Sequence, residues 1–143
     1  MVRRAAEHGR RAPEVKALLD ANTLLWSALD PGRLSPAAQR VVRPTENDLV
    51  LSAVSCIELA IKWRAGKLGP LTETLDEFIA QQIRDLRLDE LPVTREHGLQ
   101  VARLELHHRD PFDRLLVAQA QVERLAIVTN DPLIARYGVE TIW

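Results

Sequence analysis

The sequence has 143 residues, 46% of them hydrophobic and 27% charged, which is ordinary for one soluble globular domain with a single core. Its one cysteine, Cys56, excludes an internal disulfide framework and zinc-finger spacing, and it fits a reducing cytoplasm. No apolar run approaches the ~18 residues of a membrane span, so we expect a cytoplasmic protein without a membrane partner.

The charge is unevenly distributed along the chain. The net charge is −1, but residues 1–16 carry five basic against two acidic side chains, a balance of +3 that leaves −4 for the remainder. An acidic body argues against gripping nucleic acid by bulk positive charge, but not against reaching phosphate through bound cations. We interpret residues 1–14 as a disordered basic leader and residues 15–143 as the domain. A phosphate-binding arm and a translation start nearer Val15 are the alternatives for the leader.

In chain order, short apolar runs alternate with segments of helical spacing. The first half predicts a strand at Val15–Leu19, helices at Thr23–Leu29 and from Ser35-Pro36 to Val42, a strand at Leu49–Ala53 and a helix from Ser55 to Ala65 that stops at Gly66. The second half predicts a helix over residues 75–88, a strand at Leu91–Val93, a helix from Thr94 to Leu106, a helix from Asp110-Pro111 to Glu123, a strand at Leu125–Thr129, a short helix at Pro132–Ala135 and an extended end at Val139–Trp143. This alternation predicts an α/β fold with a parallel sheet of four or five short strands.

Acidic residues stand where several of these elements meet. Asp20 ends the first strand, and Glu58 is expected in the first turn of the helix after the second strand. Asp113 lies in the opening turn of the helix after His107-His108, and Asp131 follows the fourth strand. Since ligands of parallel α/β sheets bind at the carboxyl ends of the strands, these carboxylates are expected to converge.

Each acid also has a local explanation. Ser55 to Glu58 has the spacing of a capping box, and Asp110-Pro111 and Asp131-Pro132 read as helix N-caps. Asp20 could form only a turn with Asn22 or Thr23. As a set, however, clustered carboxylates repel one another unless a cation neutralises them, and all-oxygen ligands suit Mg²⁺ or Mn²⁺. Such ions activate water and stabilise a phosphoryl transition state, so the set points to phosphodiester hydrolysis.

Four segments together resemble the PIN-domain family, specifically the VapC-type toxins of toxin–antitoxin pairs. They are LLDANTLLW (18–26), SAVSCIELAIKWRAGKL (52–68), HHRDPFDRLLVAQA (107–120) and TNDPLIARYGVETIW (129–143). The third segment is the most specific, and the resemblance covers nearly everything after the leader.

The resemblance implies a three-layer α/β/α sandwich and a Mg²⁺- or Mn²⁺-dependent endoribonuclease, paired with a cognate antitoxin and expected to form a homodimer. It places the metal-binding acids at Asp20, Glu58, Asp113 and Asp131, with Asp20 and Asp113 holding the principal ion. Glu58 and Asp131 are then further ligands, or act through water. Hydrolysis by an activated water is expected to leave a 5′-phosphate and a 3′-hydroxyl.

Around these acids the resemblance places Asn22 and Thr23 as hydrogen-bonding neighbours. For Asp110 two roles stay open: a helix cap that also tunes the site, or an acid that supports the metal ligands without binding the ion. Arg114 and His108 are candidate RNA contacts, although a charge-balancing arginine and a solvated loop histidine are the simpler interpretations. Lys62 is expected to pair with Glu58 at i,i+4 spacing.

Two rival functions remain at this point. Asp20-Ala21-Asn22-Thr23 partly matches the opening motif of haloacid-dehalogenase-like phosphatases, but the second acid of that motif is missing. The other rival is a catalytically silent PIN-type module that binds RNA or protein without cutting.

Overall fold

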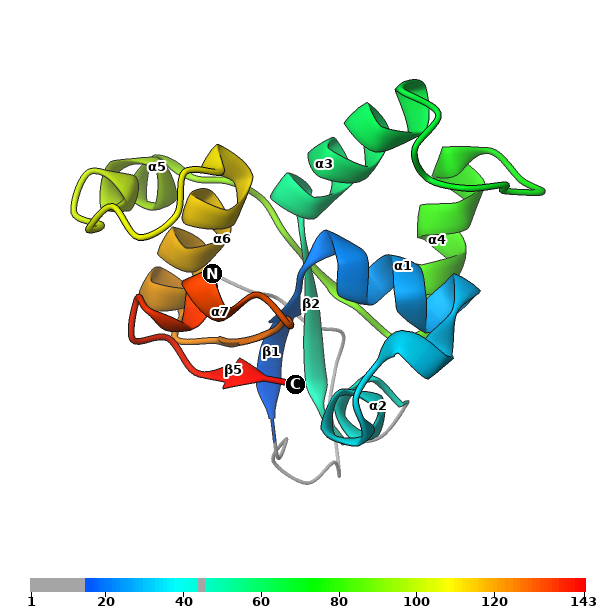
Figure 1. Cartoon of the computed structure of the whole chain (residues 1–143), viewed down its shortest axis with the longest axis horizontal. Helices are drawn as coiled ribbons and strands as arrows, with labels where there is room; N and C mark the ends of the chain where they lie inside the picture. Colours follow the sequence, from blue (N-terminus) through cyan, green and yellow to red (C-terminus); the bar gives the residue numbers. More distant parts are fainter. Residues whose placement is uncertain (1–14, 44–45) are drawn as a thin grey trace.

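The computed structural model describes residues 15–43 and 46–143, so the predicted leader at 1–14 lies outside the described residues. Five strands form one sheet in the order β3-β2-β1-β4-β5, and every neighbouring pair is parallel (Figure 1). The strands are β1 (Lys16–Leu19), β2 (Asp48–Ser52), β3 (Asp89–Leu91), β4 (Ala126–Val128) and β5 (Thr141–Ile142). The predicted parallel sheet is confirmed.

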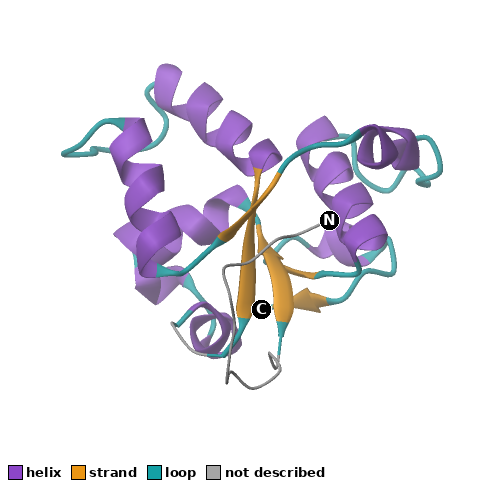
Figure 2. Cartoon of the chain, turned by 180° about the vertical axis from the view of Figure 1, so that it is seen from behind, coloured by secondary structure: helices purple, strands orange, loops and turns teal. Residues whose placement is uncertain are grey.

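Helices cover both faces of this sheet (Figures 1 and 2). The helices are α1 (Ala21–Leu29), the short 3₁₀ helix η1 (Pro31–Arg33), α2 (Pro36–Val42), α3 (Ala53–Arg64), α4 (Leu75–Asp85), α5 (Arg95–Val101), α6 (Pro111–Glu123) and α7 (Pro132–Ala135). The predicted three-layer α/β/α sandwich is therefore confirmed.

Two hydrophobic cores follow from the alternation of side chains along the strands. Leu19 of β1 and Leu51 of β2 face α1, α2, α3 and α4, whereas Leu18 and Val50 face α6 and α7 on the other side. Both faces of the central strands are buried, which is why they read as continuous apolar runs in the sequence.

Three element boundaries differ from the predictions. Helix α3 begins at Ala53 and not at Ser55, because the Ser52 hydroxyl accepts a hydrogen bond from the backbone N–H of Val54. Strand β3 lies at Asp89–Leu91, two residues before the predicted Leu91–Val93, and Val93 is exposed. Helix α5 ends at Val101 and not near Leu106, because the next three residues make tighter i→i−3 bonds that close the helix.

Each helix that follows a strand at the carboxyl edge is capped by the side chain at the junction. Asp20 caps α1, Ser52 caps α3 and Asp131 caps α7. The same local rule therefore fixes both the helix start and the position of a polar side chain at the sheet edge. No helix within the described ranges is both long and apolar enough to traverse a lipid bilayer.

Candidate functional site

The candidate site lies at the carboxyl edge of the three central strands, β2, β1 and β4. Leu19 of β1 pairs in register with Val128 of β4, so the residues that follow these strands are neighbours in space. The backbone N–H of Asp20 donates to the carbonyl of Val128, 3.3 Å away. Asp20 and the Thr129–Asp131 segment are thereby brought to one place, as predicted from the alternating pattern.

Asp20 is held at the start of α1 in a buried position. Its Oδ1 accepts a hydrogen bond of 2.8 Å from the backbone N–H of Thr23, so the local-cap explanation of this residue is confirmed. The Thr23 hydroxyl donates to the carbonyl of Val128 at 2.8 Å and ties α1 to the end of β4. Burial raises the pKa of Asp20, and hydrogen bonds from Thr129 and Thr23 partly offset that rise.

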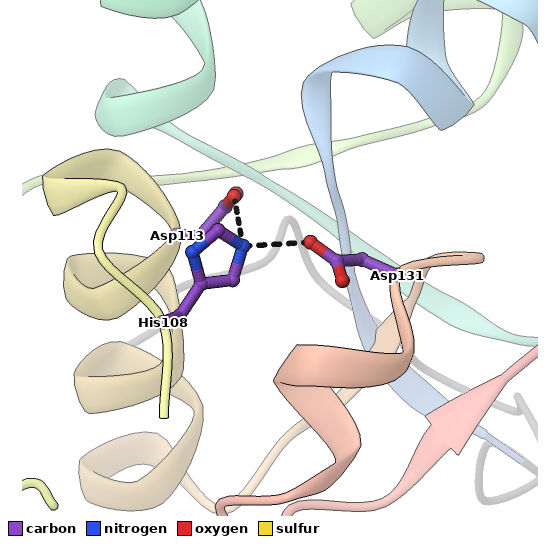
Figure 3. Close-up of side chains that lie close together, drawn as sticks. All are labelled: His108, Asp113 and Asp131. Carbon is purple, nitrogen blue, oxygen red and sulfur yellow. Dashed lines mark hydrogen bonds and ion pairs between the residues drawn. The ribbon is translucent and has the colours of Figure 1, made fainter. Parts of the chain in front are cut away.

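Asp113, Asp131 and His108 form the centre of the site (Figure 3). His108 Nε2 lies 2.7 Å from Asp131 Oδ2, a hydrogen bond, and 3.0 Å from Asp113 Oδ2. These three side chains come from the loop before α6, the first turn of α6 and the cap of α7. The predicted acids Asp113 and Asp131 thus meet across a histidine that had been interpreted as a solvated loop residue.

Helix caps and the acidic cluster use different oxygens of the same carboxylate. Asp131 Oδ1 accepts from the backbone N–H of Leu133 at 2.9 Å and caps α7, while its Oδ2 faces His108. Asp110 Oδ1 accepts from the backbone N–H groups of Phe112 and Asp113, which confirms its predicted role as the cap of α6. Capping and a place in the site are therefore compatible for Asp131.

Glu58 is linked through Lys62 to Asn22. Its Oε2 lies 3.1 Å from Lys62 Nζ, which confirms the predicted i,i+4 pair, and the same Nζ donates to Asn22 Oδ1 at 3.1 Å. The capping box predicted between Ser55 and Glu58 is wrong. Because α3 starts at Ala53, Glu58 falls in its second turn, and the Ser55 hydroxyl donates to the Leu19 carbonyl instead.

The electrostatics of Asp113 show that the acids act on one another. Burial, reinforced by negative charges nearby, raises the pKa of Asp113 to about 7. Those charges belong to Asp110, Glu58 and Asp131, whereas His108 opposes the rise. Glu58, which no hydrogen bond links to Asp113 in the described part of the chain, is thus close enough to share its field.

This donor set fits a divalent cation. Single ligand atoms of His108, Asp113 and Asp131 all lie within 4.8 Å of one another, and the nearby acids supply further carboxylate oxygens. Burial first and then the neighbouring carboxylates raise the pKa of Asp113, and a positive charge between these groups would offset both effects. The chemistry of the oxygens suits a hard ion such as Mg²⁺ or Mn²⁺.

The loop that carries His108 is fixed from the far end of the chain. The backbone N–H groups of His107 and His108 donate to the hydroxyl of Tyr137, at 3.1 and 2.8 Å. Arg114 Nη1 donates to the same hydroxyl and to the carbonyl of Glu105. Its guanidinium therefore braces the loop, and an RNA contact of Arg114 stays an untested prediction.

Sequence reasoning missed the central position of His108. The only local signal was its place two residues before Asp110, whose backbone N–H donates to His108 Nδ1 at 3.1 Å. Its carboxylate partner Asp131 is 23 residues away, so the contact depends on the packing of α7 beside α6.

The chain matches one protein family and several solved structures. The family model of the PIN domain matches residues 17–140, whereas a search of curated proteins finds no significant match. Among solved structures, the crystal structure of VapBC2 from Rickettsia felis bound to a promoter DNA fragment matches with a TM-score of 0.66 at 14% identity, covering 89% of this chain and 97% of that one. FitAcB from Neisseria gonorrhoeae matches with a TM-score of 0.59 at 20% identity, covering 87% and 95% of the two chains. PAE2754 from Pyrobaculum aerophilum also matches at 0.59, with 17% identity and 92% of each chain covered.

These identities are low, so the solved structures establish likeness of fold, and the family match covers all four predicted acids. With the parallel sheet and the acid cluster at its carboxyl edge, this chain belongs to the PIN domain family.

Proposed function

We propose that this protein is a metal-dependent endoribonuclease that acts as the toxin of a type II toxin–antitoxin pair in the cytoplasm. The observation that carries the proposal is the convergence of acids at one sheet edge, where burial and the charges of neighbouring carboxylates raise the pKa of Asp113 to about 7. PIN domains are generally nucleases, and the similar folds include VapBC2, whose name matches the VapC-type toxins that the sequence resembles. A cognate antitoxin and a homodimer are the partners we expect.

The residues divide the work according to their surroundings. Asp20 and Asp113 would hold the principal Mg²⁺ or Mn²⁺, because burial of Asp20 and partial burial of Asp113 raise both pKa values, and a cation compensates the charged forms. Glu58, in the second turn of α3, and Asp131, at the cap of α7, would complete the ligand set or orient water. The hydrogen bond with His108 keeps Asp131 Oδ2 turned toward the cluster. A bound divalent ion supplies activation of water and neutralises the charge of the phosphoryl transition state.

Residues outside this set of acids hold the site in a fixed geometry. Thr23 locks the start of α1 to β4, and Asp110 locks the start of α6. Lys62 holds Glu58 and Asn22 in a fixed relation beside the acids. These contacts keep the carboxylates in place, so little reorganisation would accompany binding of the ion and the RNA phosphate.

The test is RNA cleavage by purified protein separated from any antitoxin. Cleavage is expected in Mg²⁺ or Mn²⁺, loss of cleavage in EDTA, and at least a ~100-fold loss in Asp20→Asn and Asp113→Asn, the scale of removing an electrostatic catalytic group. Asp76→Asn, a matched change at an exposed acid on α4, should retain full activity. Product ends should be a 5′-phosphate and a 3′-hydroxyl.

A wild-type protein that binds RNA but never cuts it would replace this proposal with the silent binding module. Activity that survives EDTA and both substitutions would place the chemistry elsewhere. Circular dichroism of each variant separates loss of activity from loss of fold.

A further inference from the structure

We propose that His108 is a positioning residue that aligns Asp131 and Asp113 through its Nε2–H group and does not itself ligate the cation. The inference rests on the proposed metal-dependent function and adds a residue to it. Cation-binding geometry alone would count His108 as a ligand, since its ring nitrogen lies among the carboxylate oxygens.

The tautomer of the ring argues against ligation. The backbone N–H of Asp110 donates to His108 Nδ1 at 3.1 Å, so Nδ1 presents a lone pair and carries no hydrogen. A neutral imidazole in that state has its hydrogen on Nε2. To bind an ion, Nε2 would need to give up that hydrogen to Nδ1, where it would oppose the Asp110 N–H.

The surroundings of the ring hold that tautomer in place. The Asp110 backbone cannot turn away, because Asp110 caps α6 through its own side chain. The His108 backbone N–H is fixed in turn by the Tyr137 hydroxyl at 2.8 Å. The side chain is only 13% exposed, so water has little room to replace either contact.

The Nε2–H group therefore points at the carboxylates as a donor. It donates to Asp131 Oδ2 at 2.7 Å and lies 3.0 Å from Asp113 Oδ2 (Figure 3). The single Nε2 hydrogen holds the two carboxylates near each other. It comes from a neutral donor, so most of their negative charge remains available to an ion. In this arrangement His108 plays the part of the hydrogen-bonded neighbours that orient metal ligands in other proteins.

The first experiment reads the tautomer directly. Long-range ¹H–¹⁵N spectra of the full chain without metal should show the Nε2–H form for the signal that disappears in His108→Gln. An Nδ1–H form would overturn the inference.

The second experiment measures Mn²⁺ binding by electron paramagnetic resonance. His108→Ala should weaken Mn²⁺ affinity about tenfold, as removal of an orienting neighbour does. His108→Gln, whose amide can still donate near the Nε2 position, should recover most of that loss. Glu105→Gln is the control on the same loop and should bind as the wild type does, because the exposed Glu105 carboxylate contacts the His107 ring outside the cluster.

The bound Mn²⁺ also reports its ligand atoms through electron spin echo modulation. We expect no directly coordinated ¹⁴N in the wild type. Strong ¹⁴N coupling that vanishes in His108→Gln would make His108 a ligand and overturn this inference while leaving the nuclease proposal standing. A wild type that binds no Mn²⁺ would instead overturn both the metal requirement of the proposed function and the role given to His108.

Discussion

A histidine from a neighbouring segment lies beside each end of α6, and the two have nearly the same hydrogen-bonded arrangement. At the C-terminal end, His97 Nδ1 accepts from the backbone N–H of Thr94 at 3.0 Å, and Nε2 lies 2.9 Å from Glu123 Oε2. At the N-terminal end, His108 Nδ1 accepts from the Asp110 N–H, and Nε2 meets Asp131. In both, a backbone amide sets the tautomer and aims Nε2 at a carboxylate.

The two ends differ in burial and in the number of acids. The His97 side chain is fully buried, forms a capping box with Thr94 and sits against the buried amide of Gln119. His108 is partly exposed and faces two carboxylates, with the charge of Glu58 also acting on Asp113. The same arrangement thus forms a structural lock where the ring meets one carboxylate, and a candidate ion site where it meets two.

The largest expected effect is at the structural end. His97→Ala removes a fully buried ring, a helix cap and the partner of Glu123, so we expect a loss of about 3 kcal/mol in the free energy of unfolding. Urea denaturation measures it. His108→Ala should lose clearly less, and equal losses at both ends would contradict the division into lock and site.

Divalent ions should stabilise the fold by binding at the His108 end of α6. At a Mg²⁺ or Mn²⁺ concentration 100 times the dissociation constant, the wild type should gain about 2.7 kcal/mol. Thermal unfolding with and without ion measures the gain. It should largely disappear in Asp113→Asn but persist in Gln100→Ala, a change beside α6 on the structural side. An equal gain in all three proteins would place the ion elsewhere.

The smallest effect is a pH dependence of the metal-free protein. The pKa of Asp113 rises from 3.8 to about 7 on folding, so its ionisation destabilises the fold increasingly as the pH climbs between those values, and fully above them. Asp113→Asn should therefore be more stable than the wild type at pH 8, by on the order of 1–2 kcal/mol after solvent screening, and similar to it near pH 4. Denaturation curves across this range test the sign. A variant less stable at pH 8 would show that Asp113 is a structural acid.

Much of the fold could be predicted because its signals are local. Strands β1, β2 and β4 are apolar runs buried on both faces, and Asp20 and Asp131 cap the helices that follow β1 and β4. Asp110 caps α6 through an equally local contact. The element boundaries that were predicted wrongly lie where tertiary contacts compete with local capping and hydrophobic pattern. Ser52 and Ser55 are both possible caps of α3, and the choice of Ser52 is accompanied by its bond to Gln119 on α6. The edge strand β3 pairs with β2 alone, so a short polar run such as Asp89-Glu90 gave little sequence signal.

The sequence by itself determined the parallel α/β architecture and which acids stand at strand ends, since periodicity and capping act over a few residues. Only the tertiary structure decided how these acids meet. It turned Lys62 toward Asn22, bound Arg114 to the Glu105 carbonyl and the Tyr137 hydroxyl, and set His108 between Asp113 and Asp131. The contacts of Lys62 with Asn22, of His108 with Asp131 and of Arg114 with Tyr137 join residues 23 to 40 positions apart. They depend on how α1, α3, α6 and α7 pack at one edge of the sheet.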